Sequence, residues 1–171
     1  SIFTPMTMEI FNTKSELKAY LEKVKFPHTK IALVPTMGAL HDGHLSLINQ
    51  AQQHADIVVC SIFVNPTQFN DPKDLEKYPR PIEQDIALLQ TANCDILFLP
   101  TVEEMYPPNE EKWLIDLGRL DQIWEGEKRP GHFQGVTQIV YKLFQLVEPH
   151  IACFGQKDFQ PQFGGKEYIL E

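Results

Sequence analysis

Residues 30–69 read KIALVPTMGALHDGHLSLINQAQQHADIVVCSIFVNPTQF, and in this stretch two short apolar runs flank a segment of helical periodicity. The apolar runs, Lys30–Pro35 and Asp56–Val64, are rich in β-branched residues and predict buried strands. The segment between them, Gly43–Ala55, repeats apolar residues at the spacing of one helix face. A strand, a helix and a strand in this order indicate a βαβ unit with two parallel strands.

The same alternation continues through the rest of the chain. The other segments expected to be helical are Thr13–Lys25, Ile82–Ala92, a short piece from Thr101, and Val136–Val147. The other expected strands are Asp95–Pro100, Trp113–Leu117 and His150–Gly155. Residues 65–81, with four prolines, and residues 121–135 are expected to be loops, the former with one turn of helix. Residues 1–171 are therefore predicted to form one α/β domain, a parallel sheet with helices on both faces.

The composition argues against several classes of protein. Hydrophobic residues make up 43% of the chain and charged residues 22%, values typical of soluble globular proteins. Lysine and arginine number 15 against 23 acidic residues, and the net charge of −8 opposes binding to duplex DNA or RNA. The apolar runs are far shorter than the roughly 20 residues that span a bilayer. The first ten residues also lack the pattern of a secretory signal. We expect neither a nucleic acid nor a membrane as partner.

Three cysteines, Cys60, Cys94 and Cys153, are far apart in the sequence and lie in or beside apolar runs. Their number and spacing provide neither a disulfide framework nor a C-x-x-C motif. We therefore expect three buried thiols and a cytoplasmic protein.

The predicted sheet also predicts where a ligand binds. In open parallel sheets, ligands lie beyond the carboxyl ends of the strands. The segments that follow the predicted strands are PTMGALHDGH, NPTQF, PTVEEMYP and GQKDFQ. These segments hold most of the side chains suited to chemistry, so the site is expected at this edge.

Two histidines, His41 and His44, stand at the expected start of the helix after the first strand. A helix N-terminus carries about half a positive charge and unpaired N–H groups, which together bind anions. Histidines there can donate to phosphate, and Gly38 and Gly43 allow a close approach of the backbone. The residues alone also allow a zinc-binding pair or an incidental surface pair.

The other two polar segments each allow a functional and a purely structural interpretation. Asn65 and Gln68 offer the neutral donors and acceptors that suit a hydroxy acid, but an asparagine before proline is also typical of a turn. Lys157 could meet phosphate and Asp158 could accept from ribose hydroxyls, whereas both could equally belong to a polar turn.

Five motifs, in this order and spacing, resemble the pantothenate synthetase family, the pantoate–β-alanine ligases. They are PTMGALHDGHLSL, SIFVNPTQF, DLEKYPR, RPGHFQGV and FGQKDFQ, and they run from about Lys30 to Gln160. A lone H-x-G-H marks only the wider nucleotidyltransferase-like superfamily, so five motifs in register are far more specific. The resemblance implies a Rossmann-like sheet of the H-x-G-H superfamily.

The resemblance also implies an activity. In this family ATP and pantoate react to give pantoyl adenylate and pyrophosphate, and β-alanine then attacks the adenylate and releases AMP. The chain would be a ligase that forms a C–N bond, with Mg²⁺ accompanying the ATP. A homodimer is likewise implied.

Residue roles follow from the matching motif positions. The residues implied to bind ATP are Met37, Gly38, Ala39, Leu40, His41, Asp42, Gly43, His44, Gly155, Gln156, Lys157 and Asp158. His44 is implied to be the catalytic proton donor, and His41 and Lys157 are implied to assist at the phosphates. Gln68 is implied to bind pantoate beside the β-alanine site, with Asn65 as a second contact.

The sequence departs from the family pattern near its end. Pro161 stands where the family has a second glutamine that contacts pantoate. The segment after Gln160 does not resemble the sequence pattern of the family. The family's C-terminal lobe, which closes over ATP, is not among these 171 residues, so we expect the N-terminal ATP- and pantoate-binding domain. The alternatives are a nucleotide-binding module without turnover and another H-x-G-H nucleotidyltransferase. The NPTQF motif argues against the latter.

Overall fold

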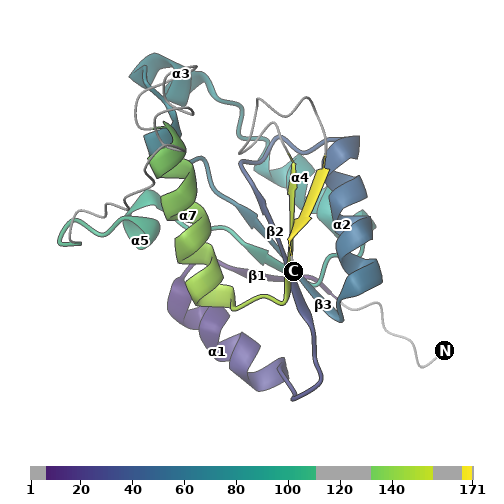
Figure 1. Ribbon diagram of the computed structural model, residues 1–171. Coiled ribbons are helices and arrows are strands. Elements are labelled where there is room, and N and C mark those ends of the chain that lie inside the picture. Colours follow the sequence, from purple (N-terminus) through teal and green to yellow (C-terminus); the bar gives the residue numbers. More distant parts are fainter. Residues whose placement is uncertain (1–6, 111–131, 156–166, 171) are drawn as a thin grey trace.

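A computed structural model describes residues 7–110, 132–155 and 167–170 (Figure 1). The strands are β1 (Glu9–Phe11), β2 (Ile31–Thr36), β3 (Ile57–Ile62), β4 (Ile96–Phe98), β5 (Ile151–Gly155) and β6 (Glu167–Leu170). The helical segments are α1 (Lys14–Val24), α2 (Asp42–His54), η1 (Pro66–Gln68), α3 (Pro72–Lys77), α4 (Ile82–Thr91), α5 (Val102–Met105) and α7 (His132–Val147). The strand expected at residues 113–117 lies outside the described residues.

The strands form one sheet in the order β1-β4-β3-β2-β5-β6. The pairs from β1 to β5 are all parallel, which confirms the predicted α/β fold with a parallel sheet. The pair of β5 with β6 is antiparallel, at the edge of the sheet. Neither β1 nor β6 was expected from the sequence, because a strand of three or four residues has too few positions to establish a periodicity of two.

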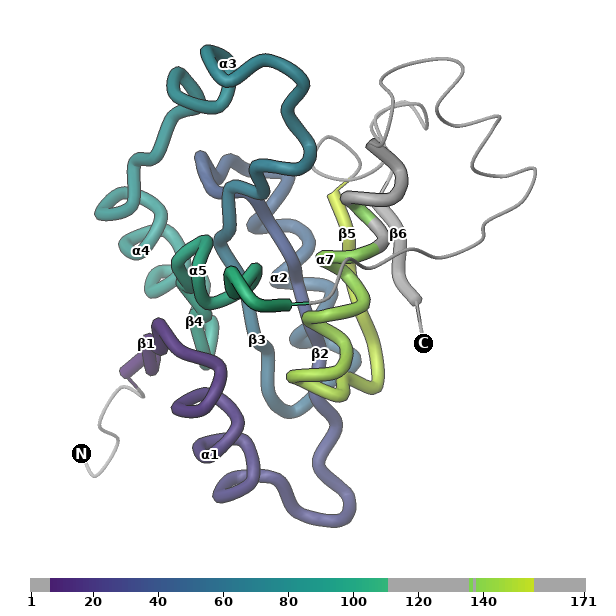
Figure 2. The backbone as a smooth tube through the Cα atoms, turned by 90° about the vertical axis from the view of Figure 1, so that its left-hand side faces the viewer, coloured from purple at the N-terminus to yellow at the C-terminus, as the bar shows by residue number. Residues whose placement is uncertain are grey.

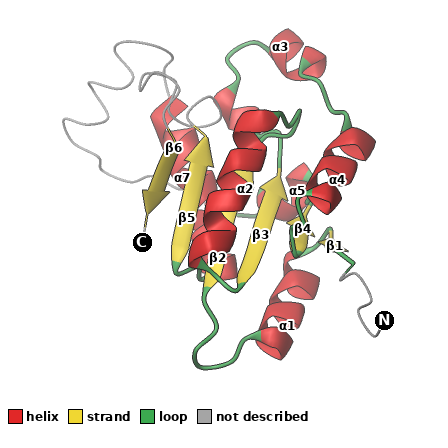
Figure 3. Cartoon of the chain, turned by 90° about the vertical axis from the view of Figure 1, so that its right-hand side faces the viewer, coloured by secondary structure: helices red, strands yellow, loops and turns green. Residues whose placement is uncertain are grey.

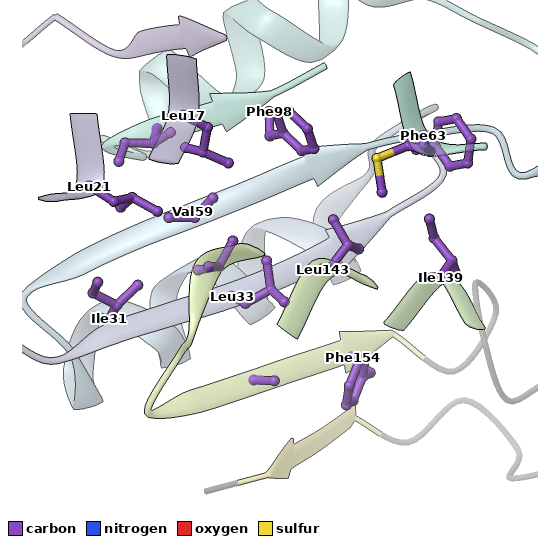
Figure 4. Packing of buried hydrophobic residues seen from close by; sticks show 14 of the residues in the cluster. Leu17, Leu21, Ile31, Leu33, Val59, Phe63, Phe98, Ile139, Leu143 and Phe154 are labelled. Carbon is purple, nitrogen blue, oxygen red and sulfur yellow. The ribbon is translucent and has the colours of Figure 1, made fainter. Parts of the chain in front are cut away.

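Helices cover both faces of the sheet because alternate residues of the buried strands point to opposite sides. Ile31 and Leu33 of β2 pack in a core beneath α1 and α7, which Figure 4 shows at close range. Ala32 and Val34 pack in a second core beneath α2 and α4. Figure 2 looks onto the side of α1, α5 and α7, and Figure 3 onto the side of α2 and α4. No helix of the described part is both long enough and apolar enough to cross a membrane.

The ends of two predicted segments differ from the structure. The helix expected from Val136 begins at His132, inside the expected loop. Once a helix is nucleated, each added residue gains one hydrogen bond, so a first turn with Gly135 can extend a well-packed helix. The proline-rich segment 65–81 contains η1 as well as α3, one more helical turn than expected. Proline at the first position of each turn explains this, because its fixed φ suits a helix start.

Removal of one side chain from the first core tests the packing of α7 on the sheet. Leu143 is fully buried in this core, so Leu143→Ala is expected to lower the free energy of unfolding by about 2–5 kcal/mol. Urea denaturation should show a lower midpoint with an unchanged slope. The exposed Gln145 on the same helix provides the control, and Gln145→Ala should change stability by less than about 0.5 kcal/mol. Equal effects of the two variants would contradict this packing.

Candidate functional site

The carboxyl ends of the central strands lie side by side at one edge of the sheet. β2 and β3 stay in register up to Thr36 and Ile62, and β5 on the other side of β2 ends at Gly155. The chain leaves β2 into the turn 37–41 and leaves β3 toward η1, so two of the predicted segments begin next to each other. Three further residues that were expected to bind ATP follow Gly155, namely Gln156, Lys157 and Asp158. They lie outside the described residues.

The turn after β2 has an unusual backbone. Gly38 has φ +82° and Ala39 has φ +52°, both in the left-handed region. A Cβ on Gly38 would lie 3.0 Å from Cγ2 of Ile62 and 3.2 Å from Oδ2 of Asp85. Glycine is therefore required at position 38 by both its φ and its surroundings. Ala39 adopts a conformation that costs a non-glycine residue about 1–3 kcal/mol, so other contacts must hold it.

The carboxylate of Asp85 provides those contacts from the first turn of α4. Its Oδ2 accepts from the backbone N–H of Ala39 at 2.9 Å, and its Oδ1 accepts from that of Leu40 at 2.8 Å. The side chain is only 1% exposed, so water scarcely competes for these bonds. Oγ1 of Thr36 accepts from the N–H of Gly38 at 3.1 Å. Three consecutive N–H groups of the turn are therefore fixed by side chains.

Asp85 is a residue of this site that the sequence analysis did not identify. Asp85 lies on the buried side of α4. Ile82, three residues before it, and Leu89, four residues after it, lie on the same side. A carboxylate at such a position of an apolar stripe needs a buried partner. That position was the available signal, but the turn that Asp85 holds is 46 residues away in the sequence.

The two histidines cap the start of α2 together. His41 is the N-cap residue, and its Nδ1 accepts from the N–H of Gly43 at 3.0 Å. The N–H of His41 donates to Nδ1 of His44 at 3.2 Å, which completes a reciprocal capping box. The ring centroids are 4.2 Å apart. The predicted pair is therefore brought together at a helix N-terminus.

These hydrogen bonds determine what the imidazoles of His41 and His44 can offer a ligand. A neutral imidazole whose Nδ1 accepts a hydrogen bond carries its proton on Nε2. Both neutral rings therefore carry an N–H donor on Nε2, a group of the kind that suits the oxygens of an anion. A zinc ion would need an unprotonated Nε2 and hence would break the cap. Of the alternatives left open by the sequence, this geometry favours the anion site.

The segment after β3 forms a small polar network. Oδ1 of Asn65 accepts from the N–H of Thr67 at 3.1 Å, from Oγ1 of Thr67 at 2.8 Å and from the hydroxyl of Tyr106 at 3.1 Å. Nδ2 of Asn65 donates to Oε1 of Gln68 at 3.1 Å. Nε2 of Gln68 lies 3.5 Å from Sδ of Met37. Asn65 thus has the predicted turn role, and it also holds Gln68.

Tyr106, the residue after α5, is a second member of the site that the sequence analysis missed. Burial raises the pKa of its hydroxyl above the ordinary value, the hydrogen bonds with Thr67 and Asn65 lower it, and the charge of Glu110 raises it. The hydroxyl is therefore protonated at neutral pH and can donate to Asn65.

Most of the predicted residues that the structure describes gather at this edge. The contact of Met37 with Gln68 joins the histidine-bearing turn to the NPTQF segment across 31 residues of sequence. Asn65, Gln68 and His44 are buried. Asp42, also expected to bind ATP, is an exposed residue in the first turn of α2. Among the described residues, no three histidine, cysteine or acidic side chains are placed to hold a metal ion.

Comparisons with known proteins identify the family. The family model described as pantoate-beta-alanine ligase matches residues 9–163, beyond both ends of the motifs. A protein of Porphyromonas gingivalis named pantothenate synthetase is 54% identical over 153 residues, which are 90% of this chain and 54% of that protein. One of Schizosaccharomyces pombe named pantoate–beta-alanine ligase is 47% identical over 154 residues, again 90% of this chain and 54% of that protein.

Solved structures agree with these relatives. The crystal structure of the Francisella tularensis pantoate-beta-alanine ligase, complexed with beta-gamma ATP and beta-alanine, has a TM-score of 0.77 and 40% identity. The match covers 84% of this chain and 54% of that one. The pantothenate synthetase of Thermus thermophilus has a TM-score of 0.74 and 47% identity, over 83% of this chain and 50% of that one. The chain spans about half the length of these proteins, and it belongs to the pantoate–β-alanine ligase family.

Proposed function

We propose that this chain provides the ATP- and pantoate-binding part of an enzyme that condenses pantoate with β-alanine to form pantothenate. The observation that carries the proposal is the contact between Met37 and Gln68. It places a histidine-capped helix N-terminus, suited to phosphate, beside a buried carboxamide suited to a hydroxy acid. The family membership supports the same substrates, although the chain spans about half of each relative.

The residues proposed to bind ATP are Met37, Gly38, Ala39, Leu40, His41, Asp42, Gly43, His44, Gly155, Gln156, Lys157 and Asp158. The N–H groups at the start of α2 and the Nε2 protons of His41 and His44 would donate to phosphate oxygens. Lys157 would add a positive charge. Gln68 is proposed to contact pantoate and to lie beside β-alanine, with Asn65 as a second contact.

The proposed reaction has two steps. In the first, a carboxylate oxygen of pantoate attacks the α-phosphorus of ATP, and the bond from that phosphorus to the bridging oxygen breaks. Negative charge then develops on the pyrophosphate, where His44, as the proposed proton donor, would stabilise it through a hydrogen bond from Nε2, assisted by His41 and Lys157. In the second step the amine of β-alanine attacks the carbonyl carbon of the adenylate, the C–N bond forms, the C–O bond to the phosphate breaks, and AMP leaves while the nitrogen loses a proton to water. This step depends mostly on holding the two reactants in contact.

Mg²⁺ is proposed to arrive as its complex with ATP. Proteins usually hold this ion by one or two carboxylates together with substrate phosphates and water. In the described part of the chain, both carboxylate oxygens of Asp85 already accept backbone N–H groups. No three histidine, cysteine or acidic side chains of the described residues are placed to hold a metal ion, which fits an ion held mainly by the phosphates. When bound, it would neutralise part of the charge that develops on the pyrophosphate.

The protein is further proposed to be a cytoplasmic homodimer. Cys60, Cys94 and Cys153 are all buried free thiols, as expected in a reducing compartment. Burial raises the pKa of Cys94 to about 12, so this thiol stays protonated and unreactive. The homodimer rests on the family resemblance.

Substitution of His44 tests the first step. His44→Ala removes one donor to the departing pyrophosphate, so pantoate-dependent pyrophosphate release should fall on the order of 10²-fold or more. The assay uses the chain extended to the full length of its relatives, with thermal unfolding to verify folding. His54→Ala at the exposed end of the same helix is the matched control and should leave the rate unchanged. Near-normal release by His44→Ala would remove His44 from the mechanism.

Gln68 separates recognition of pantoate from recognition of ATP. Loss of a hydrogen bond to a charged group costs about 1.5–3 kcal/mol, so Gln68→Ala should raise the Kd for pantoate about 10- to 100-fold. The Kd for ATP should change less than about twofold, because the proposed donors to the phosphates are the start of α2 and its two histidines rather than Gln68. Calorimetric titration of both ligands measures the two effects, with Gln90→Ala on the exposed face of α4 as control. Equal losses for both ligands would mean that Gln68 has a purely structural role.

A further inference from the structure

Three hydrogen-bond donors converge on one oxygen of Asn65. Its Oδ1 accepts from the hydroxyl of Tyr106 and from both the N–H and the hydroxyl of Thr67. The nitrogen of a carboxamide accepts no such bonds, so these donors determine which end of the Asn65 amide is which. Nδ2 of Asn65 must then point the other way, where it donates to Oε1 of Gln68 at 3.1 Å.

The orientation of Asn65 determines that of Gln68. Because Oε1 of Gln68 faces Asn65, its Nε2 lies on the side of Met37, 3.5 Å from the sulfur. The reversed carboxamide would bring two N–H groups against each other in a pocket where Gln68 is only 4% exposed. An unmade hydrogen bond of a buried group is strongly unfavourable. The series of hydrogen bonds from Tyr106 through Asn65 therefore directs the Nε2 end of Gln68 toward Met37, in the turn proposed to bind ATP.

The ring and the hydroxyl of Tyr106 have separable contacts. The ring packs against Phe63, with centroids 6.1 Å apart, and the ammonium of Lys142 lies 5.2 Å from the ring centroid. Neither contact needs the hydroxyl, which donates to Asn65. Tyr106→Phe therefore removes the donor and leaves the packing of the ring in place.

We propose that Tyr106 is a positioning residue that, through Asn65, keeps the N–H end of Gln68 turned toward the hydroxy acid. This inference rests on the proposed function, in which Gln68 contacts pantoate. It also adds a specificity rule: the ligand must present an acceptor oxygen, such as that of a carboxylate or hydroxyl, to Gln68. Tyr106 acts without touching the ligand.

The experiment compares Tyr106→Phe with the unmodified 171-residue chain by two measurements. The first records the side-chain amide resonances of Asn65 and Gln68 by NMR without ligand. The second titrates pantoate and ATP separately. Tyr20→Phe is the matched control, because the ring of Tyr20 packs against Phe11 at another place in the fold. Thr67→Val, which removes a second donor at an exposed position, should act in the same direction as Tyr106→Phe.

We expect the Gln68 amide resonances to shift. We also expect the Kd for pantoate to rise roughly three- to tenfold, which is the effect of losing about one hydrogen bond. The Kd for ATP should stay unchanged, and Tyr20→Phe should alter neither quantity. Unchanged Gln68 resonances, or an equal weakening of ATP and pantoate binding, would overturn the proposal. If the unmodified chain bound no pantoate, the proposed function would fail for this chain, whereas the resonances would still decide whether Tyr106 orients Gln68.

Discussion

The buried carboxylate of Asp85 holds the turn on which the rest of the site depends. It accepts from two successive backbone N–H groups, those of Ala39 and Leu40, in a place that water scarcely reaches. A hydrogen bond to a charged group contributes about 1.5–3 kcal/mol. Two such bonds outweigh the cost of about 1–3 kcal/mol for the left-handed backbone of Ala39. The same interaction ties α4 to the carboxyl edge of the sheet, so a helix that faces one core also shapes the site.

The geometry of the turn has consequences for both proposed substrates. The turn delivers the chain to His41, where α2 begins and where the two histidines cap each other through Nδ1. Each neutral ring then carries its proton on Nε2. Met37, the first residue of the turn, contacts the carboxamide of Gln68, and Gln68 follows a different strand. One turn therefore sets the distance between a helix start that suits phosphate and a carboxamide that suits a hydroxy acid.

The sequence predicted the parts of the fold that depend on local periodicity, and it failed where contacts are distant. The βαβ unit over residues 30–69 was predicted correctly, because buried parallel strands are continuous apolar runs and the helix between them is amphipathic. The described motif segments after β2 and β3 also lie at the carboxyl edge of the sheet, where the sequence predicted them. Asp85 and Tyr106 were missed, since each acts on a residue more than 40 positions away. Likewise, the edge strand β6 is defined by its partner β5 rather than by its own pattern.

The most direct test of this account is the affinity of the 171-residue chain for ATP–Mg²⁺ with and without the Asp85 carboxylate. Asp85→Asn leaves one acceptor for two N–H groups and sets an amide donor against the turn, so the Kd for ATP should rise about tenfold or more. The exposed Glu83 of the same helix provides the control, and Glu83→Gln should leave the Kd unchanged. A folded Asp85→Asn chain with unchanged ATP affinity, or an unmodified chain that binds no ATP, would contradict the account.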